Sequence, residues 1–282
     1  MRHLVLLCSS ALLAGSEAAT GSLPDYAPPV TVGTITAEVL PESSGLAASR
    51  RQPDVLWTHN DSGHPPLLHA IGTDGGLRGS VVLRGVPFQD PEDLAAFTLD
   101  GTPYLLLADI GDNKARYDRY RLHVFEEPPV SDLGRPLVGS VTPEWTVTYT
   151  YPDGARDAEG VGVDTRSGTV LVITKRDDPP RLYALPLRMP PDGQDVTATF
   201  LGTLGGLEAP TEEDLQNRHG DHRAQPTGFS ISPSGERAVL ATYKHLYLYS
   251  CPDGDWAAAL TAPAAILPRP QLKQAESVCF DA

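Results

Sequence analysis

Four glutamates recur at the start of similar short phrases, ESSGLA, EDLAAF, EGVGVD and ESVCFD, which open at Glu42, Glu92, Glu159 and Glu276. A fifth phrase, TGFSIS at Thr227, keeps the alternation without the acid. An internal repeat of this kind is typical of propellers, solenoids and arrays, and it places the acids by symmetry. Carboxylates that converge on one opening repel one another, which raises their pKa or favours a bound cation. The four glutamates are therefore candidate ligands of Ca²⁺, which takes 6–8 oxygen ligands in irregular geometry. The alternative is that each glutamate only bonds neighbouring backbone amides.

Two histidines lie beside carboxylates and are candidate bases. His59 precedes Asp61 in a polar loop, and His222 follows Asp221. A histidine near a carboxylate can act as a general base near neutral pH, so we name His59, Asp61 and His222 as candidate catalytic residues. Zinc at His219, Asp221 and His222 is less favoured, because zinc sites need three or four matched ligands. The sequence contains no nucleophile elbow, phosphate-binding glycine loop or zinc-protease motif.

Several polar loops are expected on the same face as the repeated acids. In an antiparallel meander, the start of the first strand and the end of the second lie at one end of the sheet. Loops that follow the predicted second strands should therefore surround the acids and take part in ligand binding. The candidate ligand-binding residues in these loops are Asn60, Asp109, Asp112, Asn113, Lys175 and Arg176.

Short runs of alternating apolar residues predict the elements that must position these side chains. The runs are rich in Val, Ile, Leu, Tyr and Thr, and they end in Gly, Pro, Asp or Asn, which is the signature of strands and turns. The only helical stretch is short, near Glu212. Four strands recur per unit at near-constant spacing, which predicts an all-β β-propeller of five (possibly six) four-stranded blades with an incomplete last blade. A large β-sandwich is the competing fold.

Charge and composition restrict the partners and the compartment. The 282-residue chain has a formal net charge of −14, which argues against nucleic acid and anionic membranes as partners. Residues 1–18 fit a signal peptide, residues 19–30 an unstructured lead-in, and residues 31–282 the propeller domain. A membrane anchor is the alternative for the first segment, but no apolar run is long enough for a transmembrane segment. We expect a secreted or periplasmic protein, in which Cys251 and Cys279 could pair.

Four segments carry a resemblance to a known family. The segments WTHNDSG from Trp57, DPEDLA from Asp90, ADIGDN from Ala108 and QAESV from Gln274 resemble signature segments of secreted bacterial β-propeller proteins with no settled activity. More distantly, the chain is similar to gluconolactonase-like and phytase-like propellers, which implies calcium at the channel mouth. Family members commonly carry Trp at the position of Pro91 and Asp at that of Ser230, and they usually continue beyond this chain.

The function expected from these patterns is that of a binding or scaffold module. Its acidic, calcium-binding face would bind a small molecule or an extracellular ligand whose identity the sequence does not give. The alternative is a calcium-dependent hydrolase of a phosphoester or lactone, with His59 or His222 as the base and the metal polarising the substrate.

Overall fold

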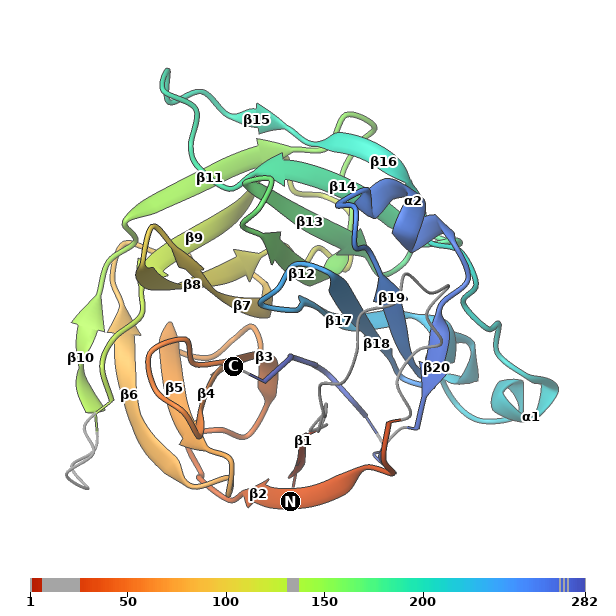
Figure 1. Cartoon of the computed structure of the whole chain (residues 1–282), viewed down its shortest axis with the longest axis horizontal. Coiled ribbons are helices and arrows are strands. Elements are labelled where there is room, and N and C mark those ends of the chain that lie inside the picture. Colours follow the sequence, from red (N-terminus) through yellow and green to blue (C-terminus); the bar gives the residue numbers. More distant parts are fainter. Residues whose placement is uncertain are drawn as a thin grey trace, which may run out of the picture.

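Four large, mainly antiparallel sheets stand around a common centre, as in a β-propeller (Figure 1). The computed structural model describes residues 2–6, 26–130, 137–268, 270, 272 and 274–281. From the centre outwards, the first sheet consists of β3 (Ser43–Ala48), β4 (Val55–Asn60), β5 (Leu67–Gly72) and β6 (Leu77–Leu83), and the second of β7 (Pro91–Leu99), β8 (Thr102–Asp109), β9 (Tyr120–Glu126) and β11 (Trp145–Thr150). The third sheet consists of β12 (Ala158–Asp164), β13 (Thr169–Thr174), β14 (Arg181–Pro186) and β16 (Thr199–Thr203). The fourth consists of β17 (Pro226–Ile231), β18 (Arg237–Thr242), β19 (Leu246–Ser250) and β20 (Ala265–Leu267).

The core lies between neighbouring sheets, as the alternation of each strand requires. One apolar cluster joins the first and second sheets, another joins the second and third, and a third joins the third and fourth. The second and third sheets therefore bury both faces against neighbouring sheets, and the first and fourth sheets bury one face in this way. Within the second sheet, Asp100 and Gly101 connect β7 to β8, and both have positive φ (52° and 80°), as a two-residue hairpin turn of type I′ requires.

Every innermost strand carries a β-bulge near its start. The register against the second strand shifts between Ser44 and Leu46 in β3, between Pro91 and Asp93 in β7, between Ala158 and Gly160 in β12, and between Pro226 and Gly228 in β17. The extra residues are Gly45, Glu92, Glu159 and Thr227. A bulge redirects the side chain that it contains, and bulges are common beside functional sites. The repeated phrase thus encodes a bulged inner strand.

The blade count differs from the five (possibly six) predicted, because the described residues form four large sheets, two of five strands and two of four, besides one two-stranded sheet. The last copy of the phrase, ESVCFD at Glu276, lies in residues 274–281, which are described but contain no strand. Val278 and Phe280 pack towards the fourth sheet, whereas Cys279 packs towards the first. The segment therefore has the side-chain alternation of an inner strand, and the part of the chain that the structure describes contains no strand paired with it.

The remaining elements lie around these sheets. β10 (Leu137–Val141) and β15 (Val196–Thr197) extend the first two sheets in parallel, which the sequence did not predict. β1 (Arg2–Leu6) pairs with β2 (Val30–Ile35), while residues 7–25, which hold most of the predicted signal peptide and lead-in, lie outside the described residues. The helices are α1 (Glu212–Leu215), η1 (Gly220–Ala224) and α2 (Trp256–Thr261). Among the described residues, no helix is long and apolar enough to cross a membrane. Cys251 and Cys279 are free.

Candidate metal centre

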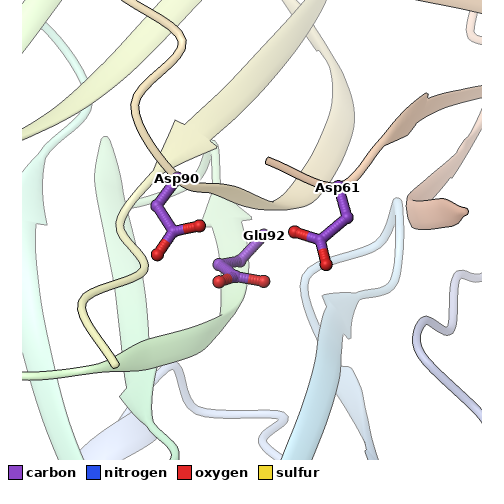
Figure 2. Close-up of side chains that lie close together, drawn as sticks. All are labelled: Asp61, Asp90 and Glu92. Atoms are coloured by element: carbon purple, nitrogen blue, oxygen red, sulfur yellow. The ribbon is translucent and has the colours of Figure 1, made fainter. Parts of the chain in front are cut away.

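Three carboxylates from two neighbouring sheets meet at one end of the inner strands (Figure 2). Asp61 follows β4, Asp90 precedes β7, and Glu92 is the bulged residue of β7. One ligand oxygen from each lies within 4.8 Å of the others. Asp90 and Glu92 are buried, and Asp61 is partly exposed. The pKa of Glu92 is raised well above its usual value. Burial is the largest cause, and the neighbouring Glu159 carboxylate is the next.

Local backbone contacts hold Asp90 and Glu92 in this position. The Asp109 carboxylate accepts hydrogen bonds from the backbone N–H groups of Gln89 (3.1 Å) and Asp90 (2.6 Å). The N–H of Gly111 donates to the backbone carbonyl of Asp90 at 2.9 Å. A Cβ atom on Gly111 would collide with the Glu92 carboxylate and lie 2.7 Å from Cγ of Asp90. The ADIGDN segment therefore needs its glycine, because both carboxylates pack against that Cα.

A second charged group lies beside the triad. The Lys175 ammonium, at the end of β13, forms an ion pair with Oε1 of Glu159 and contacts the Tyr243 hydroxyl at 3.3 Å. Tyr243 in turn donates to Glu276 at 3.4 Å. Burial raises the pKa of Glu159 to about 7, although Lys175 opposes this shift. Burial by itself lowers the pKa of Lys175, but Glu159, Tyr243 and Glu92 raise this pKa overall. The face thus contains both a carboxylate triad and a buried ion pair.

A carboxylate at the centre links three inner strands. Asp93 is completely buried, and it accepts hydrogen bonds from the backbone N–H groups of Leu94 (2.8 Å), Val161 (2.8 Å) and Phe229 (3.2 Å). These donors belong to β7, β12 and β17. Burial raises the pKa of Asp93 well above its usual value, and the three donors oppose this shift. Asp93 therefore fixes how the inner strands stand relative to one another, and with them the bulged residues.

The polar loop residues named from the sequence mostly bind neighbouring parts of the chain, and Arg176 and Asn113 bond each other. Oδ2 of Asp112 accepts the backbone N–H groups of Arg116 and Tyr117 at 2.7 Å each. The N–H of Asp112 donates to Asp157 at 2.7 Å. Arg176 lies 2.7 Å from Asp157, and it also bonds Asn113. These contacts tie the loop after β8 to the loop after β13. They stabilise the rim of the face, and Asn113 and Arg176 are the members with exposure to solvent.

The three candidate catalytic residues do not come together. His59 is fully buried, its Nδ1 lies 2.9 Å from the Asn60 carbonyl, and burial lowers its pKa to about 4. His222 lies in η1 and is 3.6 Å from Asp221. η1 contacts α1, which lies at the outer edge of the molecule (Figure 1). Asp61 is in the carboxylate triad, and the imidazole beside it is that of His64, whose Nδ1 lies 3.1 Å from the Asp61 carbonyl oxygen.

Two further candidates belong to the segment that precedes β3. The Asn60 side chain accepts the Glu42 N–H at 3.2 Å and donates to the Val39 carbonyl at 2.8 Å, so it holds this segment. The Glu42 carboxylate is 53% exposed and lies 3.9 Å from His64. The register places Gly45, and not Glu42, at the position of Glu92 and Glu159. This shift of three residues separates the Glu42 side chain from the other repeated acids.

Sequence reasoning missed Asp90 as a ligand candidate, and it also missed the linking role of Asp93. A signal for Asp90 was present, because an acid precedes two of the glutamates by two residues, in Asp90-Pro-Glu92 and Asp157-Ala-Glu159. Side chains two apart on a strand project to the same side. No comparable signal marks Asp93, whose role depends on contacts with β12 and β17.

Comparisons with known proteins add little beyond the fold. No protein-family model and no curated protein matches the chain. A chain in the crystal structure of a nidogen/laminin complex is similar to this one at a TM-score of 0.44 and 13% identity, over 84% of this chain and 68% of that chain. The propeller assignment rests on the arrangement of the sheets described above.

Proposed function

We propose that this protein is a β-propeller binding module whose acidic face binds one Ca²⁺ ion through Asp61, Asp90 and Glu92 and presents it to an extracellular ligand. The observation that carries the proposal is the convergence of three carboxylate oxygens within 4.8 Å of one another. Calcium–oxygen distances of about 2.3–2.6 Å let one ion touch oxygens up to roughly 5 Å apart, whereas Mg²⁺ needs about 2.0–2.1 Å and stricter geometry.

The environment of Glu92 supports a bound cation. Glu92 is only 5% exposed, and among the described residues no hydrogen-bond donor contacts its carboxylate. A buried carboxylate without donors is costly unless it takes up a proton or a positive ion. Asp61 and Asp90 lie on either side of it and add to the repulsion (Figure 2). A divalent ion would relieve this repulsion at all three side chains.

A binding role fits this geometry better than hydrolysis. Three side chains fill only part of a calcium shell of 6–8 oxygens, which leaves positions for water or for oxygens of a ligand. The bases expected for the hydrolase alternative do not suit it, because the His59 ring is buried and His222 is in η1; the imidazole near the triad is His64, which contacts the Asp61 backbone carbonyl. Asp61 is the triad member with exposure to solvent, so the ligand would approach from its side.

The test is calcium titration of the metal-free protein, followed by calorimetry and by melting temperature. We expect one ion per chain and a rise in melting temperature, because an ion present at 100 times its Kd stabilises the fold by about 2.7 kcal/mol. Glu92→Gln should abolish both effects. Glu236→Gln, an exposed residue of the same type, is the matched control. Glu42→Gln separates the triad from the ring of four glutamates, because only the ring predicts weaker binding in that variant. Calcium binding that survives Glu92→Gln would refute the proposal.

A further inference from the structure

The buried Lys175 ammonium lies among the same acids as the proposed metal. Its side chain is 10% exposed, it pairs with Glu159, and it lies 3.3 Å from the Tyr243 hydroxyl, which contacts Glu276. The charge on Glu92 also acts on it. A buried ammonium is costly unless it is paired and hydrogen-bonded. Lys175 therefore supplies the positive charge that Glu159 and its neighbours require.

The two inner strands that follow β7 along the chain carry bulged residues with side-chain oxygens. Glu159 and Thr227 occupy the bulges of β12 and β17, as Glu92 does in β7. Glu276 is next to this group, because a Cβ on Gly228 would lie 2.8 Å from Cα of Ser277. The hydroxyl of Thr227 is fully buried and has no hydrogen-bond partner among the described residues. Two carboxylates and a hydroxyl are oxygen donors of the kind that hard cations prefer.

We propose that Lys175 is a built-in cation that fills a second cation position, formed by Glu159, Glu276 and Thr227, and thereby restricts the propeller face to one metal ion. The inference rests on the proposed function for the first ion and adds a residue that sets the number of ions. Without the ammonium, Glu159 would lose its ion-pair partner while the charges of Asp157, Glu276 and Glu92 still act on the two buried glutamates. Neighbouring buried carboxylates require either protons or another cation.

The test compares calcium binding by the wild-type protein, Lys175→Met, Lys175→Arg and the double variant Lys175→Met/Glu159→Gln, each by calorimetry on metal-free protein. We expect one ion for the wild-type protein and for Lys175→Arg, which keeps the charge. Lys175→Met should bind two ions, and the double variant should return to one. Lys175→Met that binds the same number of ions with unchanged affinity would overturn the inference.

A second variant keeps the inference testable if Lys175→Met does not fold. Folding of Lys175→Met only with calcium would support it, since the ion then replaces the ammonium. If this variant stays unfolded at every calcium concentration, Glu159→Gln decides. That variant leaves the ammonium unpaired beside Glu92, so its charge should weaken binding at the triad about tenfold. Unchanged affinity in Glu159→Gln would refute the role of Lys175.

The two proposals fail in different ways. If the wild-type protein binds no calcium but Lys175→Met gains one ion that Glu159→Gln removes, the triad is not a metal site and the second position is real. If Glu92→Gln abolishes binding in the wild-type protein and Lys175→Met gains nothing, the triad is a metal site and Lys175 is only a structural partner of Glu159.

Discussion

The residue at the bulge determines what each inner strand contributes to the acidic face. The four sheets place Gly45, Glu92, Glu159 and Thr227 at this position. The His59 imidazole packs against Gly45, because a Cβ on Gly45 would lie 2.5 Å from the imidazole Nε2. The ring is therefore uneven, with the acids gathered on the second and third sheets. This unevenness explains why a metal would lie off the centre, close to β7.

Gly111 offers a test of the triad that leaves every carboxylate in the chain. A Cβ at this position would collide with the Glu92 carboxylate, although the φ of Gly111 is outside the left-handed region and permits alanine. We expect Gly111→Ala to fold and to weaken calcium binding at least about tenfold, because displaced ligands lose the common distance that the ion needs. Calorimetry measures the affinity. Gly139→Ala is the matched control, since a Cβ there meets no atom within 4 Å.

An affinity of Gly111→Ala equal to that of the wild-type protein would show that the ion, if bound, does not use the observed positions of Asp90 and Glu92.

Part of this site could be predicted from the sequence. The repeated acids predicted Glu92 and Glu159 on one face, and in the structure the Glu159 charge acts on Glu92. The phrase at Glu42 misled, because a glycine that carries no functional group, Gly45, holds the equivalent position.

The inner strands are linked at the scale of elements by a single buried carboxylate. Asp93 on β7 accepts N–H groups from β12 and β17 as well as from its own strand. Neighbouring blades of a propeller otherwise contact each other mainly through apolar side chains, which specify their relative height less strictly than hydrogen bonds do. Asp93 therefore helps to place Glu92 level with Glu159.

Replacement of Asp93 by alanine should destabilise the whole fold. The change leaves three buried N–H groups without an acceptor, and we expect a loss of about 3 kcal/mol or more in the free energy of unfolding. Asp93→Asn keeps one carbonyl oxygen and should lose less. Urea denaturation in the presence of chelator measures the loss, and Asp100→Asn, at a side chain that is 82% exposed, is the control. A loss below about 1 kcal/mol in Asp93→Ala would contradict the linking role.

The strands were more predictable than their register. Alternation and turn residues specify where a strand runs, and the repeated phrase marked all four inner strands. A bulge does not change the alternation enough to be seen in one sequence, so the shift of the first sheet by three residues could not be read. The phrase at Glu276 encodes the right side-chain alternation, but a strand also needs a paired neighbour, and repeat counting cannot supply that information.

The distribution of charge in the whole molecule makes its stability depend on pH and calcium together. Burial raises the pKa of Glu159 to about 7 and that of Glu92 well above its usual value. In the unfolded chain both groups ionise near pH 4.5. Between these values the folded state binds more protons than the unfolded state, so stability falls as pH rises. Burial lowers the pKa of His59, His69 and His123, so these histidines make stability increase as pH rises, but only below their ordinary pKa of 6.5.

The clearest window therefore lies above pH 6.5, where the buried glutamates of the folded protein lose their protons. In chelator, we expect the free energy of unfolding to decrease as pH rises from about 6.5 to 8.5, by up to about 1.4 kcal/mol per pH unit for each responding group. Saturating calcium should flatten this dependence, because the ion replaces the proton at Glu92. Glu92→Gln should flatten it in part without calcium. Urea denaturation at several pH values measures the slope. If the stability of the metal-free protein stays constant or rises over this range, these carboxylates are already ionised and compensated by Lys175.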